Sequence, residues 1–174
     1  MSGFSVFEEF AFWIVKYYVP VMVANGVPVL VKGSHRVDFG KEFFDGKPVF
    51  GSNKTWEGLL VGVCYAFVAG SLISIATGEE VIALLGGFAG LFALLGDLAG
   101  AFVKRRLNIK PGDPLPIIDQ LDFVFSSTLL YLALRVEEVV SKPYYVLITF
   151  SIILALHVVA NNIAFYMGLK DKRW

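Results

Sequence analysis

Three aspartates and a basic cluster are the side chains of this sequence best suited to chemistry. Asp97 lies alone in an apolar run at residues 81–103, and Lys104 begins the basic cluster that closes this run. Asp119 and Asp122 follow a short link rich in Pro and Gly. A carboxylate in membrane hydrocarbon costs about 3 kcal/mol even on lenient insertion scales, so Asp97 is expected to be functional. Carboxylates and cations gathered at one membrane face suit a metal ion and a phosphate.

The spacing of these residues indicates how they share a site. Asp97 and Lys104 are two helical turns apart on one face, about 10 Å along the axis. Asp119 and Asp122 are three residues apart and also share a face. The three carboxylates offer the oxygen ligands that Mg²⁺ prefers. Two alternatives stay open: Asp97 pairs with a Lys or Arg of another helix, and Asp119 caps a helix N-terminus.

A second polar segment, residues 50–58, precedes another apolar run. It brings together small and donor residues: Gly51, Ser52, Asn53, Lys54 and Thr55. Backbone N–H groups at a helix N-terminus favour anions, so this segment predicts phosphate binding. The alternative is that Ser52 or Asn53 only caps the following helix.

Long apolar runs must position these residues. The chain has 174 residues, of which 56% are apolar or aromatic and 17% charged, with a mean hydropathy of +0.68. A soluble domain carries about 25% charged residues. Runs of about 20 apolar residues mark transmembrane helices, and five lie at residues 10–31, 58–77, 81–103, 123–140 and 144–167. We therefore expect an all-α integral membrane protein whose residues 1–174 form a single membrane domain.

The charges are sorted between the two ends of these runs. Twelve of the 15 Lys and Arg residues lie at residues 32–54, at residues 104–110 or at the C-terminus. Acidic pairs mark the opposite side: Glu8-Glu9, Glu79-Glu80 and Glu137-Glu138. The positive-inside rule then places the N-terminus outside and the C-terminus inside. Residues 32–54 and 104–118 become two long cytoplasmic loops, and the active site of this multi-pass cell-membrane protein faces the cytoplasm.

Local signals refine this picture. Pro20 and Pro28 flank Asn25-Gly26, which predicts that the first helix bends or unwinds there. Asp45-Gly46 predicts a turn of a small hairpin. Small residues recur along one face of the run at residues 81–103, where another helix can approach closely. That helix belongs either to the same chain or to a second copy, so a homodimer is one expected arrangement.

Residues at the end of the last run are more simply explained by structure. His157, Asn161 and Asn162 lie at helical spacing, and interhelical hydrogen bonds are the ordinary role of such residues in a membrane. We expect the basic residues Lys170, Lys172 and Arg173 to anchor the C-terminus at the membrane surface. No nucleic-acid partner is expected.

The order of these residues resembles the signature of a known family. Gly96-Asp97-Leu98, Lys104-Arg105, Pro111-Gly112 and Asp119-Gln120-Leu121-Asp122 follow the pattern of the CTP-dependent phosphatidate cytidylyltransferases. Residues 52–58 are similar to their upstream Ser-Pro-Lys-Lys-Thr-x-Glu-Gly segment. This chain has Gln120 where the family has Arg, and Asp113-Pro114 where it has His-Gly. With Asn25-Gly26 and the loop from Asp38 to Asp45, these departures resemble the archaeal branch, the CDP-archaeol synthases.

The resemblance implies an activity and a role for each residue. The expected reaction joins CTP to 2,3-bis-(O-geranylgeranyl)-sn-glycerol 1-phosphate and releases pyrophosphate. Asp97, Asp119 and Asp122 would hold one or two Mg²⁺, with Lys104 beside them. The CTP substrate would bind a further set: Asn25, Asp38, Asp45, Ser52, Asn53, Lys54, Thr55, Glu57 and Arg105. Catalysis would come from positioning and charge neutralisation, because a lipid phosphate is already a nucleophile.

Two other functions compete with this one. A CTP-dependent polyprenol kinase would transfer the γ-phosphate and release CDP. A small transporter would bind its substrate near the membrane midplane, between repeated halves. The polar residues here gather at one end, and no internal repeat is visible in the sequence.

Overall fold

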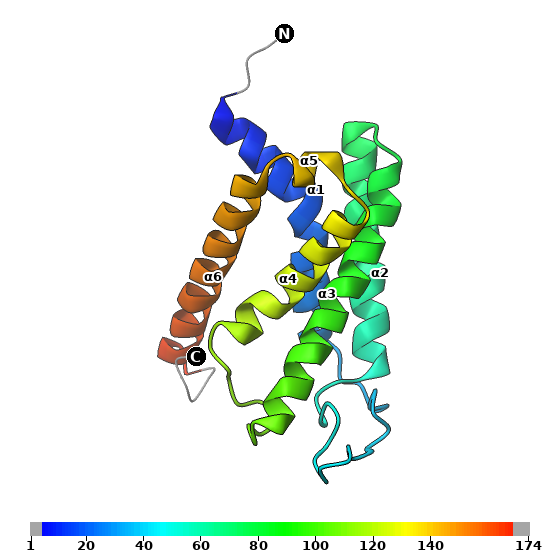
Figure 1. Cartoon of the computed structure of the whole chain (residues 1–174), viewed down its shortest axis with the longest axis vertical. Helices are drawn as coiled ribbons and strands as arrows, with labels where there is room; N and C mark the ends of the chain where they lie inside the picture. The colour runs from blue at the N-terminus through cyan, green and yellow to red at the C-terminus, as the bar shows by residue number, and fades with distance from the viewer. Residues whose placement is uncertain (1–4, 169–174) are drawn as a thin grey trace.

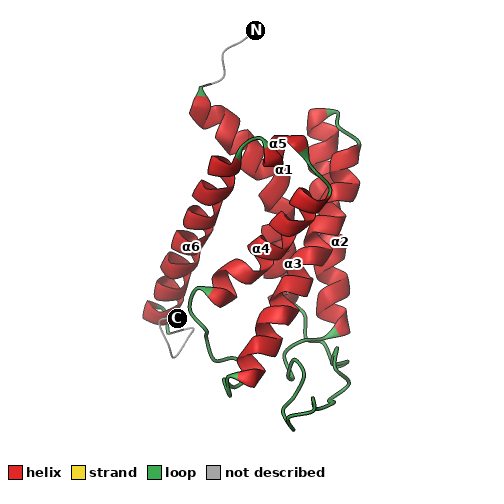
Figure 2. Ribbon diagram, viewed as in Figure 1, coloured by secondary structure: helices red, strands yellow, loops and turns green. Residues whose placement is uncertain are grey.

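The computed structural model describes residues 5–168 and consists of helices joined by loops (Figures 1 and 2). Four long helices are apolar enough to cross a membrane. They are α1 (Val6–Gly26), which continues into the 3-10 helix η1 (Val27–Leu30), α2 (Trp56–Thr77), α3 (Val81–Arg106) and α6 (Pro143–Tyr166). Between α3 and α6 lie α4 (Ile118–Ala133) and the short α5 (Glu137–Val140). The prediction of an all-helical membrane protein is confirmed. The predicted basic anchor at residues 170–173 lies outside the described residues.

The predicted helix at residues 123–140 is corrected by the structure. α4 begins five residues earlier, at Ile118, and ends at Ala133. Arg135 takes a left-handed conformation with φ 51°. The Val136 N–H then bonds to the Tyr131 carbonyl at 2.9 Å, and the Arg135 N–H to the Leu132 carbonyl at 3.1 Å. This hydrogen-bond pattern is a Schellman C-cap. Glycine usually occupies the left-handed position, so an arginine there could not be recognised as a helix end from the sequence.

Small residues let three helices approach closely. On α3, a methyl group added to Gly86 would lie 2.9 Å from the Cα of Gly70 on α2, and one added to Gly90 would lie 2.2 Å from the Ala66 Cβ. α1 packs against both helices. The small-residue face of α3 is therefore covered by α2 within one chain, which is one of the two arrangements expected.

Aromatic side chains fill the end of the bundle near α5. Trp13, Tyr17 and Tyr18 of α1 meet Tyr131 of α4 and Tyr145 of α6, and all five are buried. Figure 1 shows this end opposite the long loops, with α4 running between α3 and α6. The core therefore fixes one end of the bundle, and the loops lie at the other.

The unwinding of the first helix and the turn at Asp45-Gly46 are confirmed. α1 gives way to η1 after Gly26. The Phe43 N–H bonds to the Lys47 carbonyl at 2.8 Å, and Glu42 and Pro48 form an isolated antiparallel bridge. The first loop is thus a compact structure held against the membrane helices.

Candidate active site

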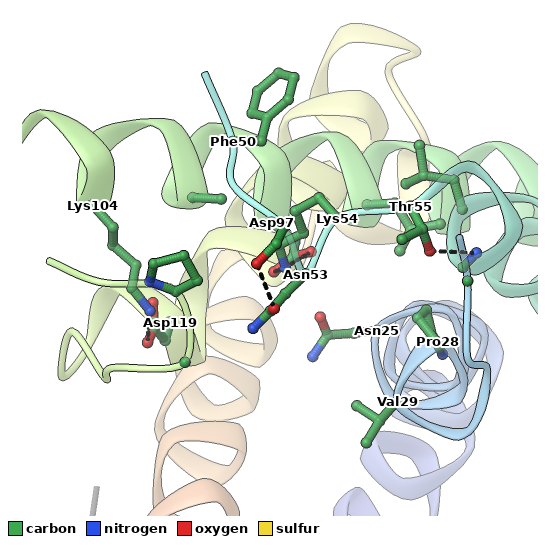
Figure 3. Close-up of a pocket in the computed structure, with 18 of the residues that line it drawn as sticks. Asn25, Pro28, Val29, Phe50, Asn53, Lys54, Thr55, Asp97, Lys104 and Asp119 are labelled. Carbon is green, nitrogen blue, oxygen red and sulfur yellow. Dashed lines mark hydrogen bonds and ion pairs between the residues drawn. The ribbon is translucent and has the colours of Figure 1, made fainter. Parts of the chain in front are cut away.

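A polar cavity of about 720 Å³ opens at the loop end of the bundle. α1, η1, the first loop, α2, α3, the second loop, α4 and α6 all contribute to its wall. Figure 3 shows Asn25, Asn53, Lys54, Asp97, Lys104 and Asp119 around it. Nine of the thirteen residues predicted for the site line this cavity: Asn25, Ser52, Asn53, Lys54, Thr55, Asp97, Lys104, Arg105 and Asp119. Segments distant in the sequence are therefore brought to one place.

Two lysine–carboxylate pairs face the cavity. Lys54 Nζ lies 2.5 and 2.7 Å from the two carboxylate oxygens of Asp97. Lys104 Nζ lies 2.7 Å from Asp119 Oδ2, which also accepts the Leu115 N–H at 2.9 Å. Asp97 therefore has a lysine partner, as the first alternative predicted, but this lysine comes from the loop before α2 and not from another helix. These side chains are between 13% and 27% exposed, so a ligand in the cavity can reach them.

Arg105 presents a different kind of cation to the same cavity. Its side chain is only 6% exposed, and its Nε and Nη1 atoms are buried without a hydrogen-bond partner among the described residues. Gly51 lies beside the guanidinium, since a methyl group there would lie 3.5 Å from Arg105 Nη1 and 3.2 Å from Pro111 Cγ. A buried guanidinium with unused donors is suited to bind a phosphate.

The first loop is tied to α2 so that Lys54 is held in place. The Val37 N–H bonds to the Lys54 carbonyl at 2.9 Å, and the Trp56 N–H bonds to the His35 carbonyl at 2.9 Å. Thr55 caps α2, because its hydroxyl oxygen accepts the Gly58 N–H at 3.3 Å. The alternative that Ser52 or Asn53 caps this helix is therefore wrong.

Glu57 and Asp38 hold the loop and do not line the cavity. Glu57 accepts the backbone N–H groups of Ser34 and His35 at 3.1 and 3.2 Å, and its carboxylate meets the His35 ring at 2.6 Å. Asp38 accepts the N–H groups of Gly40, Phe50 and Gly51 at 2.9–3.0 Å. Their predicted contact with the nucleotide stays a prediction, and the contacts that the structure shows are with the loop.

The ionisation of Asp38 follows from these contacts. Burial of its side chain favours the neutral acid, but the N–H donors of Gly51, Phe50 and Gly40 favour the carboxylate more strongly. Together they hold the pKa of Asp38 below its ordinary value. The carboxylate is therefore the form that organises the loop.

Asp45 also serves the loop. Its carboxylate lies 3.0 Å from Arg106 Nε, and the Arg106 guanidinium packs over the rings of Phe43 and Phe102. Asp45 is not among the residues that line the cavity. The pair fastens the turn of the first loop to the end of α3.

Asp122 is not among the residues that line the polar cavity, although it lies close enough to Asp97, Asp119 and Lys54 to interact with their charges. It lines a separate, apolar cavity of about 380 Å³ between α3 and α4. A methyl group on Gly100 would lie 2.1 Å from Asp122 Oδ2, so the carboxylate would have to move if a larger residue replaced this glycine. Among the described residues, no three His, Cys, Asp or Glu side chains gather closely enough to hold a metal ion. Asp97 and Asp119 thus share the polar cavity, and Asp122 lies outside its lining.

Sequence reasoning missed one residue of α4 and two residues of α6 that line this cavity. Gln120 of α4 and His157 and Asn161 of α6 line it. The ring of His157 lies 5.8 Å from that of Phe123 on α4. The four-residue spacing of His157 and Asn161 places them on one helical face, but only the packing of α6 against α4 shows that this face meets the cavity.

Comparison with known proteins identifies the family. The family described as "CarS-like: CDP-archaeol synthase" matches residues 7–174, which include every residue of the cavity. The CDP-archaeol synthase of Staphylothermus marinus is 54% identical over the full length of both chains. That of Hyperthermus butylicus is 43% identical over 90% of this chain and 92% of its own. The chain belongs to the CDP-archaeol synthase family.

A solved structure agrees with this assignment to the CDP-archaeol synthases. Described as "Structural insight into an intramembrane enzyme for archaeal membrane lipids biosynthesis", it is 36% identical, with a TM-score of 0.77 over 90% of this chain and 94% of its own. The resemblance seen in the sequence motifs is therefore confirmed. So is the prediction of a multi-pass membrane enzyme.

Proposed function

We propose that this chain transfers the cytidylyl group of CTP to 2,3-bis-(O-geranylgeranyl)-sn-glycerol 1-phosphate. A phosphate oxygen of the lipid attacks the α-phosphorus of CTP, the bond to the bridging oxygen breaks, and pyrophosphate leaves. The single observation that supports this most is the polar cavity, lined by paired lysines and carboxylates, at one end of the apolar helices. It occurs in a chain that belongs to the CDP-archaeol synthase family. Such a cavity lets a soluble nucleotide meet a lipid headgroup.

The cations of the cavity are assigned to the phosphates. Lys54, Lys104 and Arg105 line it, and the buried Nε and Nη1 atoms of Arg105 have no hydrogen-bond partner among the described residues. Ser52 and Asn53 add neutral donors to the same wall. The lipid phosphate needs no protein base, so these residues act by positioning both substrates and by neutralising charge.

Asp97 and Asp119 fit a magnesium ion. Mg²⁺ is commonly held by one or two carboxylates and by substrate phosphates, and both carboxylates face the cavity. A bound ion would neutralise charge on the phosphates. The lysines that now neutralise the carboxylates would then be available to phosphate oxygens. Asp122 faces Gly100, so we assign it a position behind the site, and the two carboxylates in the cavity suit one ion.

We place the cavity on the cytoplasmic side. Both long loops lie at this end, and they carry most of the Lys and Arg residues, in keeping with the positive-inside rule. α4 runs from the cavity end to the α5 end, so it serves as a fifth crossing although it has only 16 residues, about 24 Å in length. The N-terminus is then outside and the C-terminus inside.

The proposed site is contained in one chain. Each residue assigned to the substrates or to the metal ion belongs to the same bundle, and the small-residue face of α3 packs on α2. A homodimer would have to use another surface of the molecule.

Product analysis tests the function. Purified protein in detergent is given Mg²⁺, CTP and either the geranylgeranyl-ether or a diacyl glycerol phosphate. We expect pyrophosphate and a CDP-lipid in equal amounts, formed faster with the ether substrate. A parallel assay supplies polyprenol in place of the glycerol phosphate, and release of CDP with a newly phosphorylated polyprenol there would contradict the proposal and indicate a kinase.

A further inference from the structure

The buried amide of Gln120 lines the cavity beside the carboxylates and cations. Gln120 lies in the first turn of α4, next to Asp119, and its side chain is only 3% exposed. It lines the same cavity as Lys54 and Lys104. Its Oε1 atom is buried and has no hydrogen-bond partner among the residues that the structure describes. A buried amide oxygen without a donor is unfavourable, so native proteins normally give it one.

The orientation of α4 separates Gln120 from the carboxylates. At 100° per residue, Gln120 and Phe123 lie on one side of Asp119, and Asp122 lies on the other. Phe123 contacts the His157 ring of α6, whereas Asp122 faces Gly100 of α3. Gln120 therefore belongs to the part of the cavity wall that α4 and α6 form, where Asn161 also lies. This part offers neutral hydrogen-bonding groups, while the cations come from α3 and from the loop before α2.

The chemistry of the substrates limits what can bind Oε1. An amide oxygen only accepts hydrogen bonds, so its partner must carry an N–H or O–H group. The triphosphate and the ionised lipid phosphate offer acceptors, and the ether-linked glycerol has no free hydroxyl. The nucleoside of CTP does have donors, namely the 4-amino group of cytosine and the ribose hydroxyls.

We propose that Gln120 is a specificity-determining residue that reads the nucleoside of CTP, with its Oε1 accepting a hydrogen bond from one of these donors. The inference rests on the proposed use of CTP. It assigns the triphosphate to the cations of α3 and the loop before α2, and the nucleoside to the neutral wall of α4 and α6. The cytidylyl group then lies between them, beside Asp97 and Asp119.

The assignment of Gln120 to the nucleoside is tested by combining one variant of the protein with three analogues of CTP. The KM values of CTP, of an analogue without the 4-amino group, of 2′-deoxy-CTP and of 3′-deoxy-CTP are measured with the wild type and with Gln120→Met. In the wild type, removing the donor that Gln120 reads should raise KM by about tenfold, the size of one buried hydrogen bond. In Gln120→Met the same removal should have no effect, because the acceptor is gone. The KM of the lipid phosphate should stay the same.

Two further variants keep the test decisive. Gln120→Glu retains acceptor oxygens and loses the amide N–H groups, so it should keep the discrimination. Ser127→Ala removes a buried hydroxyl from the same helix, hydrogen-bonded to the carbonyls of Ala89 and Phe123, and should leave all four KM values unchanged. It controls for a general loosening of α4.

Several results would overturn the inference. The first is that each analogue raises KM by the same factor in Gln120→Met as in the wild type. The second is that folded Gln120→Glu no longer discriminates between CTP and the analogues. The third is that Gln120→Met changes only the KM of the lipid phosphate. A wild-type enzyme that makes no CDP-lipid would instead refute the proposed function. The two failures are thus distinguishable.

Discussion

The two ends of the bundle use the same chemical groups for different purposes. Near α5, Lys16 is buried and its Nζ lies 2.7 Å from the carboxylates of both Glu79 and Glu138. At the loop end, Lys54 and Lys104 pair with Asp97 and Asp119 at similar distances. Lys16 joins α1 to α5 and to the turn between α2 and α3, within an aromatic core. The pairs at the loop end instead face a cavity of about 720 Å³.

A neighbouring cavity, and not the ion pair itself, separates a structural role from a chemical one. Lys16, Glu79 and Glu138 line neither of the two cavities described above, so we expect their ion pairs to contribute to the stability of the fold alone. An ion pair beside a cavity can exchange its partner for a substrate or a metal ion. Variants at the two ends should therefore affect different measured quantities.

The largest effect is expected near α5. In Glu79→Gln/Glu138→Gln, Lys16 stays buried without a counter-charge, so the free energy of unfolding should fall by about 3–5 kcal/mol. Lys16→Met should cost less, because the side chains of Glu79 and Glu138 are 43% and 48% exposed and remain solvated. Denaturant unfolding in detergent measures both. An equal or larger loss in Lys16→Met would contradict the structural role.

At the loop end, Asp97→Asn should affect the reaction and leave the fold intact. We expect kcat/KM to fall about 100- to 1,000-fold, the usual loss when a preorganised charge is removed from an active site. Lys54 keeps access to solvent, so the melting temperature should change little. Near-wild-type turnover at saturating Mg²⁺ would remove Asp97 from the site.

Arg105→Gln should separate function from stability. Losing a charged donor to the phosphates should raise the KM of CTP about 10- to 100-fold. The free energy of unfolding should not fall, because the variant removes buried donors that lack partners in the free protein. Arg106→Gln is the matched control, since it breaks the contact with Asp45 outside the cavity. Arg106→Gln should make the first loop more flexible, and it should change the KM of CTP less than Arg105→Gln does.

The smallest effect concerns Asp38 and pH. Its pKa is lowered in the folded protein, so its carboxylate stabilises the loop above the ordinary pKa of about 3.9, and this contribution is lost as pH falls through the lower folded value. Hydrogen exchange at Gly40, Phe50 and Gly51, corrected for intrinsic rates, should therefore accelerate only below about pH 4. Asp38→Asn should exchange about fivefold faster at pH 7, the effect of about 1 kcal/mol. Unchanged exchange in this variant would show that other contacts hold the loop.

Much of the site could be predicted because its charged side chains lie in short segments that can be recognised in the sequence. Asp97 is conspicuous in an apolar run, and Lys54 and Lys104 border such runs. The same reasoning did not foresee that Asp38 and Glu57 bind loop N–H groups, since carboxylates beside a nucleotide and carboxylates that bind loop N–H groups look alike in a sequence. Only the partners of each oxygen, visible in three dimensions, distinguish the two roles.

The remaining features depend on packing and on backbone geometry. Gln120 and Asn161 face the cavity because α4 and α6 pack in one particular rotation, which no local signal determines. The end of α4 depends on a left-handed Arg135, and its start on Ile117 at φ 71°. A β-branched residue rarely adopts such a φ. Neither Ile117 nor Arg135 is a glycine, so the left-handed conformation of these two residues could not be predicted from the sequence.

The most direct test compares two matched pairs of substitutions. Asp97→Asn/Asp119→Asn and Glu79→Gln/Glu138→Gln each convert two carboxylates to amides, and both CDP-lipid formation and melting temperature are measured for each. We predict that the first variant loses turnover and melts close to the wild type. We expect the second to melt at a lower temperature and to keep its turnover per folded molecule. Loss of turnover in a fully folded Glu79→Gln/Glu138→Gln variant, or turnover retained in Asp97→Asn/Asp119→Asn, would contradict the assignment of the reaction to the cavity.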